Sequence, residues 1–352
     1  MTRKQASFLQ SIPFAFKSTL NNGPQDTLRR VRRYIYGKKT IMPLPTFVQI
    51  ELTTLCNFKC TTCSRESLPT SRLNQSISSE LVSRLLSQLP GLREVKLQGL
   101  GEPLMTPGIR DIISIIREHN SKVKILTVTN GSLLSVKKYR EIALSVDDLR
   151  ISFDSTNKDN FEKIRVNSNY SKILEGIRLL INERNSIKSK TRISLDFVAT
   201  HLNYGEIPDL EEVAISLGID EIGINEVQNW YIPSQDEYVS ESKFIAESRN
   251  FTIDIKRNFL NLRKKLQPHG IKVVYMDASP MKNTCTWPFN GSFITSDGYV
   301  TSCCIRMDPD ANNFGNIFKS EFKEIWNNEK YVEFRKAIIQ GRNNGVCDHC
   351  PN

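Results

Sequence analysis

Three cysteines stand close together in the sequence, at Cys56, Cys60 and Cys63, with the spacing C-x3-C-x2-C. A cubane iron–sulfur cluster takes four ligands, usually all cysteine. No further cysteine follows for more than two hundred residues, so a cluster bound here is expected to keep one iron open for a reactant. The alternatives are a zinc knuckle, which needs a nearby fourth Cys or His, and three unrelated buried thiols. None of the four histidines is near the trio in sequence, which favours the open cluster and makes the chain a candidate enzyme.

A second set of cysteines comprises Cys285, Cys303, Cys304, Cys347 and Cys350. Its pattern, C-x17-C-C-x42-C-x2-C, holds one thiol more than a four-ligand site needs. Spacing alone allows either zinc or an iron–sulfur cluster. Adjacent side chains on a strand point to opposite faces, so only one of Cys303 and Cys304 should be a ligand.

Short apolar runs typical of strands alternate with amphipathic helical runs between about residues 46 and 228. The predicted strands are 46–54, 94–100, 123–129, 148–154, 192–199 and 221–227. Apolar residues at helical spacing predict helices at Ser79–Leu89 and Ile109–Glu118. This alternation implies βαβ units and a parallel sheet, and therefore the α/β class. The pattern fits both a partial (β/α)6 barrel and a doubly wound sheet.

The rest of the chain has a different character. Residues 240–268 predict a long polar helix, followed by a short strand at 271–275. Asp297-Gly298, between two β-type runs, predicts a hairpin, and two helical stretches follow it. We therefore expect four parts: a basic N-terminal arm (1–44), a core barrel (45–235), a helical connector (236–284) and a small α+β domain (285–352).

The cysteine trio resembles the signature of the radical S-adenosylmethionine superfamily. In that family the open iron chelates the amino and carboxylate groups of S-adenosylmethionine. One electron from the cluster then yields a 5′-deoxyadenosyl radical, which abstracts hydrogen from an unactivated C–H bond. The resemblance implies the partial TIM-like barrel rather than the doubly wound sheet. It also implies a [4Fe–4S] cluster and S-adenosylmethionine as cofactors, and an external one-electron donor such as flavodoxin or ferredoxin.

The stretch Gly99-Leu-Gly101-Glu102-Pro103 follows the second predicted strand. It resembles the family's Gly-Gly-Glu-Pro motif, which binds the methionyl amino group, although Leu100 separates the two glycines here. Glycine allows close backbone approach, and a carboxylate can pair with an ammonium. Taken alone, the stretch would also fit an ordinary strand-to-helix turn.

Further cofactor contacts are expected at the ends of later strands. By resemblance, Asn130, Ser152 and Asn203 are candidates to contact the ribose and carboxylate of S-adenosylmethionine. The alternative for each is a turn or capping role, which Asn and Ser often play. The residue before the third cysteine is usually aromatic in the family and lies near adenine, but here it is Thr62. Phe58 is the candidate that would supply this stacking instead.

The second cysteine set and its surroundings resemble the SPASM module that follows many barrels of this superfamily. The matching stretches include Cys285-Thr-Trp-Pro, Phe314-Gly-Asn-Ile and Glu324-Ile-Trp326. The resemblance assigns Cys285, Cys303, Cys347 and Cys350 as ligands of one auxiliary [4Fe–4S] cluster, with Cys304 as a possible replacement for Cys303. Because the sequence ends at Asn352, we expect the shortened twitch form with one cluster. A cluster closed by four protein ligands is expected to carry electrons rather than bind substrate.

The chain of 352 residues is 39% hydrophobic and 24% charged, as is usual for a soluble globular protein. Residues 1–40 carry nine Lys and Arg against Asp26 alone, so they hold +8 of the net charge of +10. We expect this arm to be solvated or to dock an anionic partner. No secretory signal or membrane-length apolar run is found. The clustered cysteines favour metal binding over disulfides, so a cytoplasmic location is expected.

Two substrate classes fit the resemblance. The first and leading one is a ribosomally synthesised peptide, because SPASM-bearing relatives often modify peptides and the basic arm could dock an acidic leader. The second is an amino sugar, cyclitol or other small molecule in natural-product biosynthesis, which would be dehydrogenated or epimerised. That chemistry would need a base, for which Asp277 and Glu226 are candidates. Stable nucleic-acid binding is not expected, because basic residues do not cluster beyond residue 40.

Overall fold

The computed structural model describes residues 40–227, 246–276, 285–340 and Cys347. Nine strands form one sheet in the order β11-β10-β1-β3-β4-β5-β7-β8-β9. These strands are β1 (Phe47–Ile50), β3 (Glu94–Leu97), β4 (Lys124–Thr129), β5 (Asp148–Ser152), β7 (Arg192–Ala199), β8 (Glu221–Glu226), β9 (Lys272–Met276), β10 (Gly291–Ile294) and β11 (Val300–Thr301). Every neighbouring pair is parallel except β10 and β11. The predicted α/β class with a parallel sheet is confirmed.

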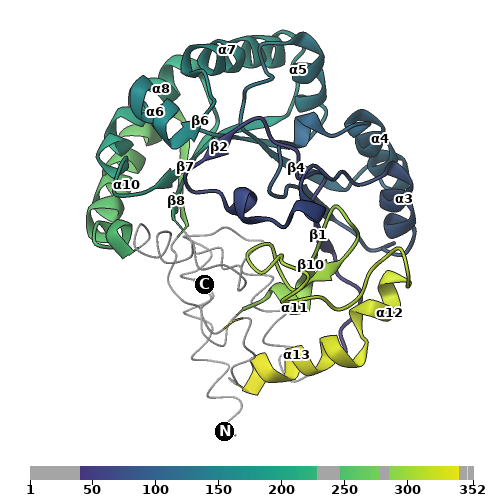
Figure 1. Cartoon of the computed structure of the whole chain (residues 1–352). Helices are drawn as coiled ribbons and strands as arrows, with labels where there is room; N and C mark the ends of the chain where they lie inside the picture. The colour runs from purple at the N-terminus through teal and green to yellow at the C-terminus, as the bar shows by residue number, and fades with distance from the viewer. Residues whose placement is uncertain (1–39, 228–245, 277–284, 341–346, 348–352) are drawn as a thin grey trace, which may run out of the picture.

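Helices cover the outside of this sheet as an arc (Figure 1). The arc consists of α3 (Ser79–Ser87), α4 (Ile109–His119), α5 (Lys137–Ala143), α6 (Lys158–Ile164), α7 (Tyr170–Ser186), α8 (Leu210–Leu217) and α10 (Thr252–Leu266). In α4, Ile109, Ile112, Ile113 and Ile116 lie on one face and are all buried in the main core. Burying such side chains is what holds each helix on the sheet, at about 1.5–3 kcal/mol per residue. Within the described ranges, no helix has both the length and the apolar character needed to span a membrane.

The six predicted strands correspond to β1, β3, β4, β5, β7 and β8, and they lie side by side in that order. Among the described residues no ladder joins β9 to β11, so the sheet stays open and the barrel is partial. A two-stranded antiparallel sheet lies apart from it, made of β2 (Lys59–Cys60) and β6 (Arg165–Val166). This small sheet brings the cysteine loop against the segment between α6 and α7.

The later part of the chain extends the same sheet. The predicted strand at 271–275 is β9, which pairs in parallel with β8, so the expected connector contributes to the barrel sheet. The predicted helix at 240–268 is α10 from Thr252 onward; residues 240–245 lie outside the described part. The predicted hairpin is β10 and β11, with Gly298 at φ +84° in its turn, a conformation that glycine adopts without strain.

The hairpin contacts the barrel sheet directly, because β10 pairs in parallel with β1 at the edge of the barrel. Short helices follow it: α12 (Phe322–Trp326) and α13 (Glu329–Gln340), with α11 (Trp287–Asn290) before it. Figure 1 shows β10, α11 and α12 beside β1, below the arc of barrel helices. The C-terminal part is therefore placed directly against the strand that precedes the cysteine trio.

Candidate functional site

The cysteine trio lies in the loop after β1, at the carboxyl end of the parallel strands, where active sites of such barrels are found. All three thiols are partly exposed. They are close enough to influence each other's ionisation, and the Cys63 amide donates to the Cys60 carbonyl oxygen at 3.1 Å. No three His, Cys, Asp or Glu side chains of the described residues converge on one point that could hold a single metal ion.

Two polar side chains reach the sulfur atoms of the trio. Asn130 Nδ2 lies 3.9 Å from Cys56 Sγ, and Arg165 Nη1 lies 3.9 Å from Cys60 Sγ. Arg165 is in turn fixed by a buried ion pair with Asp154, at 2.6 Å. Sequence reasoning missed Arg165, because only the pairing of β2 with β6 brings it to the trio. Hydrogen bonds to cluster sulfurs tune reduction potential, so these residues can act on a bound cluster.

Burial dominates the acidity of the three thiols. It raises the pKa of Cys60 to about 12 and that of Cys63 to about 11, and it also raises the pKa of Cys56. Arg165 opposes this shift at Cys60, but it does not overcome it. At neutral pH the thiols of the free protein are therefore protonated, and metal binding must release those protons.

This acidity predicts pH-dependent cluster loading. Each thiol that binds iron gives up one proton, so the affinity for iron should rise with pH, by up to about a thousandfold per pH unit for three protons. The rise should continue up to the thiol pKa values, about 11 and 12 for Cys63 and Cys60. The measurement is anaerobic competition for iron with a chelator of known protonation, repeated at several pH values. Iron retention that does not change with pH, after correction for the chelator, would contradict this assignment.

The Gly99–Pro103 stretch is held against the cysteine loop through its backbone. The Gly101 amide donates to the Thr53 carbonyl at 3.1 Å, and the Glu102 amide donates to the Leu55 carbonyl at 2.7 Å. Both glycines are sterically required. A Cβ on Gly99 would overlap the Glu51 side chain, and a Cβ on Gly101 would overlap the carbonyls of Thr53 and Leu55. These glycines thus let the Gly99–Pro103 backbone pack closely against the cysteine loop, as predicted.

Replacing Gly101 with alanine should therefore be costly. The added methyl would meet the Leu55 carbonyl oxygen at 2.5 Å and the Thr53 carbonyl closer still. Since neither backbone can easily move, we expect a loss of about 1–3 kcal/mol of unfolding free energy. Gly91→Ala is the matched control, because its Cβ meets nothing within 4 Å. Thermal unfolding of both variants tests this, and equal stability would show that the motif can shift without cost.

The Glu102 carboxylate joins the ends of two strands. It is buried and accepts hydrogen bonds from Thr129 Oγ1 (2.7 Å), the Asn130 backbone amide (2.7 Å) and the Leu104 backbone amide (3.1 Å). Burial raises its pKa, and these hydrogen bonds oppose the rise. The carboxylate thus positions the turn and Asn130 together. Whether it also pairs with a ligand ammonium stays a prediction.

The other predicted cofactor residues have different surroundings. Asn130 lies beside Cys56 and also donates to Asn57 Oδ1 at 2.9 Å, so it is part of the trio's surroundings. Ser152 is the last residue of β5. The Asn203 amide donates to the carbonyls of Asp154 and Val198 and accepts from Thr200, an arrangement that fits a turn role. Phe58 is buried within the main apolar core. Their contacts with S-adenosylmethionine stay predictions.

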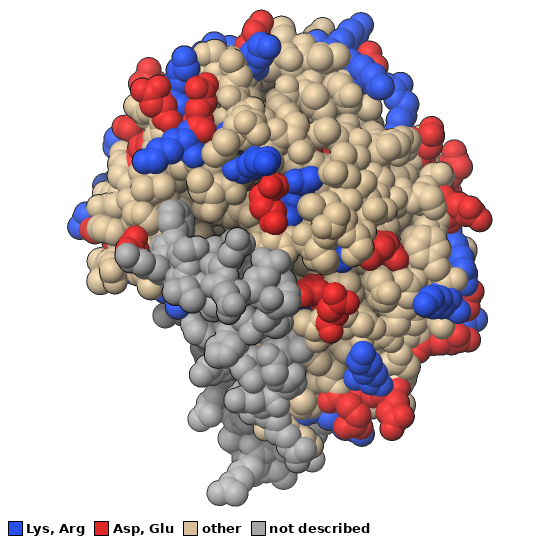
Figure 2. Space-filling view, viewed as in Figure 1, with Lys and Arg blue, Asp and Glu red and all other residues tan. Residues whose placement is uncertain are grey.

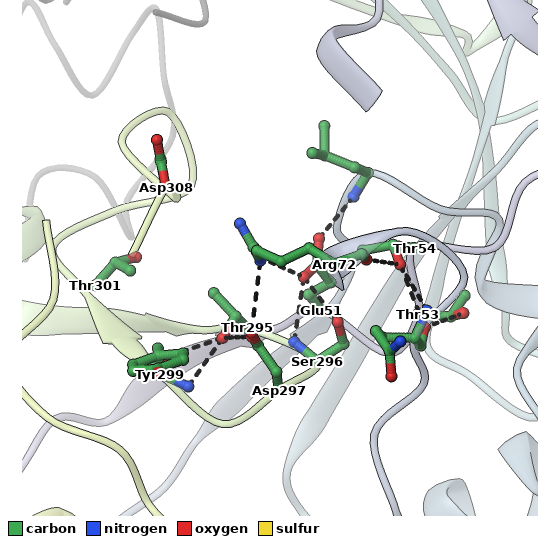
Figure 3. Close-up of polar contacts among 12 residues, drawn as sticks. Glu51, Thr53, Thr54, Arg72, Thr295, Ser296, Asp297, Tyr299, Thr301 and Asp308 are labelled. Carbon is green, nitrogen blue, oxygen red and sulfur yellow. Dashed lines mark hydrogen bonds and ion pairs between the residues drawn. The ribbon is translucent and has the colours of Figure 1, made fainter. Parts of the chain in front are cut away.

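Glu51, directly after β1, connects the trio's strand with the C-terminal part (Figure 3). Its fully buried carboxylate accepts from the Leu100 amide at 3.2 Å and from the Ser296 amide and hydroxyl at 3.1 Å each. Arg72, from the loop after the trio, lies 3.3 Å from Glu51 and 3.6 Å from Asp297. The cofactor motif, the cysteine loop and the hairpin therefore share one buried carboxylate. Sequence reasoning missed it, since 245 residues separate Glu51 from Ser296.

Four of the five C-terminal cysteines lie in described parts of the chain; Cys350 lies outside them. Burial is the main cause that raises the pKa of Tyr331, and Cys303 and Cys285 add to the rise, so both thiols lie near its hydroxyl. Cys304 instead packs in a small apolar cluster with Leu68, Leu100, Phe293 and Met307, beside Cys63. The two adjacent thiols therefore have different surroundings, which favours Cys303 over Cys304 as the auxiliary ligand.

The two candidate bases are placed unequally. Glu226, the last residue of β8, is buried and accepts a hydrogen bond from the Tyr275 hydroxyl on β9. Asp277 lies outside the described residues. Neither role as a base is tested by this arrangement.

Two family models match the chain. The one described as "Radical SAM superfamily" matches residues 50–197, and the SPASM model, described as "Iron-sulfur cluster-binding domain", matches residues 285–351. The first region contains the trio and the Gly99–Pro103 stretch, and the second contains the whole C-terminal cysteine set. The two matches therefore cover both cysteine sets.

Individual proteins are similar over most of the chain. A protein of Methanocaldococcus jannaschii named "Probable GTP 3',8-cyclase" is 27% identical over 272 residues, which is 74% of this chain and 85% of that protein. Streptococcus suis SuiB, solved bound to its precursor peptide SuiA, superposes with a TM-score of 0.67 at 16% identity, over 89% of this chain and 72% of SuiB. The structure of anSMEcpe with bound AdoMet gives a TM-score of 0.64 at 17% identity, covering 84% of both chains. At these identities the solved structures show a shared fold.

Proposed function

Since the chain is a radical SAM superfamily member with a SPASM iron–sulfur domain at residues 285–351, we propose that it reductively cleaves S-adenosylmethionine and abstracts hydrogen from an unactivated C–H bond. The superfamily match confirms the predicted cofactors: a [4Fe–4S] cluster, S-adenosylmethionine and an auxiliary iron–sulfur cluster. When bound, the trio's cluster and S-adenosylmethionine would supply the 5′-deoxyadenosyl radical. The chain's own residues bind, orient and shield that chemistry.

One observation carries the proposal. The three thiols lie at the carboxyl end of β1, and the Gly99–Pro103 turn is hydrogen-bonded onto the same loop through Thr53 and Leu55. Cys56, Cys60 and Cys63 would hold three irons of the cluster and leave the fourth for the cofactor. Glu102 orders the turn beside that position, while Asn130 and Arg165 donate toward the sulfurs. The residues proposed to hold the cluster and those proposed to hold S-adenosylmethionine thus lie at one edge of the barrel.

The auxiliary cluster is proposed to accept an electron from a substrate radical or to help re-reduce the trio's cluster. Cys285, Cys303, Cys347 and Cys350 would close it, leaving no position for substrate. Its domain is tied to the barrel by the β1–β10 ladder and by Glu51, so its position relative to the trio is fixed. A flavodoxin or ferredoxin would supply the electron that starts each turnover.

A ribosomally synthesised peptide remains the first substrate class we propose. Its support is the shared fold with SuiB, whose structure was solved with the precursor peptide SuiA. A small molecule is the second candidate, supported by the relatives named as GTP 3′,8-cyclases. Dehydrogenation or epimerisation would then need a base, the role proposed for Glu226 or Asp277.

The distribution of charged side chains on the surface bears on partners other than the substrate. On the face shown in Figure 2, acidic and basic side chains are interspersed, without a broad surface of one sign. Residues 1–39 lie outside the described part, so docking of an anionic partner on the basic arm stays a prediction. A reducing compartment such as the cytoplasm is proposed because free cluster thiols require one.

The test is anaerobic reconstitution with iron and sulfide, followed by reduction in the presence of S-adenosylmethionine. We expect 5′-deoxyadenosine and methionine in equal amounts, measured by liquid chromatography and mass spectrometry. Protein reconstituted without iron is the control. If the fully loaded protein forms no 5′-deoxyadenosine, the proposed function is wrong.

A further inference from the structure

The Gly99–Pro103 turn is held in shape by the segment that leads from β1 into the cysteine loop. Residues 98–102 lie between β3 and the short helix η3 (Pro103–Met105), so contacts with neighbours fix this backbone. Three of its amides donate to backbone carbonyl oxygens of that segment: Gln98 to Ile50, Gly101 to Thr53 and Glu102 to Leu55. The Leu100 amide differs, because it donates at 3.2 Å to a side chain, the Glu51 carboxylate. The middle of the turn therefore depends on where the Glu51 side chain lies.

The two oxygens of the Glu51 carboxylate bind different parts of the molecule. Oε1 accepts the hydrogen bond from the Leu100 amide. Oε2 accepts the backbone amide and the hydroxyl of Ser296, at 3.1 Å each, and lies 3.3 Å from Arg72 Nη2. Because a carboxylate group is planar, the donors at Oε2 also fix the direction in which Oε1 points. The hairpin of β10 and β11 thus determines where the Leu100 amide is held.

The surroundings of Glu51 suit an ionised carboxylate in one fixed position. The side chain is fully buried, and a buried charge is strongly destabilising unless it has partners. Burial raises its pKa, and the nearby Arg72 guanidinium is the largest influence that opposes the rise. The groups that reach it from Leu100, Ser296 and Arg72 are all donors, as an ionised carboxylate requires. Gly99 leaves it room, because a Cβ there would come within 2.2 Å of Glu51 Cγ.

The hairpin that fixes Glu51 also leads to a proposed ligand of the auxiliary cluster. The Glu51 backbone amide donates to the Ile294 carbonyl at 2.9 Å, which continues the pairing of β1 with β10. Arg72 lies between Glu51 and Asp297 of the hairpin turn, 3.6 Å from the Asp297 carboxylate (Figure 3). β11 follows this turn, and Cys303 comes two residues after the end of β11. One side chain therefore connects the C-terminal hairpin with the cofactor motif.

We propose that Glu51 is a positioning residue for S-adenosylmethionine: the C-terminal hairpin fixes its carboxylate, and the carboxylate holds the Gly99–Pro103 turn in the shape that binds the cofactor. This inference rests on the proposed function, which assigns the turn to the cofactor site. Ser296, 245 residues away in sequence, then influences cofactor binding through Glu51. Weakening its hold on the carboxylate should lower the affinity for S-adenosylmethionine and leave the rate of cleavage at saturation almost unchanged.

The first measurement is hydrogen–deuterium exchange of the full chain without S-adenosylmethionine, followed by mass spectrometry in peptides that contain residues 98–102. Ser296→Ala removes the hydroxyl donor to Glu51 but keeps the backbone amide, so the hairpin should still fold. We expect exchange at the Leu100 amide to become about three- to tenfold faster, which corresponds to the loss of one hydrogen bond.

The second measurement is calorimetric binding of S-adenosylmethionine to the reconstituted, oxidised protein, in which no electron is available for cleavage. Ser296→Ala should raise the Kd about three- to tenfold. Glu51→Gln, which turns an amide donor toward other donors, should raise it about ten- to hundredfold. The rate of 5′-deoxyadenosine formation by Ser296→Ala at saturating cofactor should stay within about twofold of the wild type. In the double variant the two effects on Kd should not add, since Ser296 acts through Glu51.

Ser292→Ala is the matched control, because the buried Ser292 hydroxyl donates to the Thr301 carbonyl within the same hairpin, at 3.1 Å. It should lose a similar amount of thermal stability but bind S-adenosylmethionine as the wild type does. The inference is overturned if Ser296→Ala leaves the exchange rate or the Kd unchanged, or if Ser292→Ala weakens binding as much. A wild type that forms no 5′-deoxyadenosine would overturn the proposed function instead, while the exchange measurement, which needs no cofactor, still tests the link through Glu51.

Discussion

Replacing Cys60 with alanine is expected to abolish formation of 5′-deoxyadenosine, down to the background of the assay. Each of the three cysteines binds one iron of the cubane, and two cysteines are not enough to hold the cluster in place. Cys60 is also the thiol that Arg165 contacts, so the variant removes one contact of a buried cation that keeps its ion pair with Asp154. The same loss is expected for Cys56→Ala and Cys63→Ala. The measurement is product analysis after anaerobic reduction.

Thr62→Ala is the matched control for this experiment, because Thr62 lies in the same loop between two ligands but carries no thiol. It should retain cleavage of S-adenosylmethionine. Cleavage that survives in Cys60→Ala would show that the trio does not hold the reactive cluster.

Replacing Cys303 with alanine is expected to halve the iron content, from about eight atoms per chain to about four, the difference between two cubanes and one. Cys303 lies near Tyr331 together with Cys285, whereas Cys304 packs with Leu100 beside the other site. Cys304→Ala should therefore keep about eight irons. This pair of adjacent residues is its own control, because each variant removes one thiol from the same segment.

Anaerobic iron and sulfide analysis of the two variants decides the assignment. The reverse pattern, with iron lost in Cys304→Ala and kept in Cys303→Ala, would make Cys304 the ligand. A wild-type value near four irons would mean that the protein binds one cubane and has no auxiliary cluster.

Local patterns were enough to predict the barrel strands and the cysteine loop. The predicted strand at 192–199 coincides with β7 (Arg192–Ala199), because Ile193, Leu195 and Phe197 alternate with polar residues. The predicted first strand at 46–54 was too long: β1 ends at Ile50, where Glu51 turns to its buried partners. Alternation marks strand character, but it does not show where hydrogen bonding to a neighbour stops.

Contacts between distant segments could not be predicted from the sequence. The hairpin turn at Asp297-Gly298 was evident, yet nothing local indicates that β10 pairs with β1. The same holds for the contact of Arg165 with Cys60 and for the hydrogen bond from Ser296 to Glu51, since each depends on the folded arrangement. The role of Glu102 was also underspecified, because its burial and three hydrogen bonds appear only in three dimensions.

The most direct test of the central claim is the electron paramagnetic resonance spectrum of the reduced protein before and after addition of S-adenosylmethionine. The cofactor would carry isotopic labels in its amino nitrogen and carboxylate oxygens. If the trio leaves one iron open for these groups, the labels should produce hyperfine coupling to the cluster in the wild type and none in Cys60→Ala. A spectrum of the wild type that S-adenosylmethionine leaves unchanged would contradict the account.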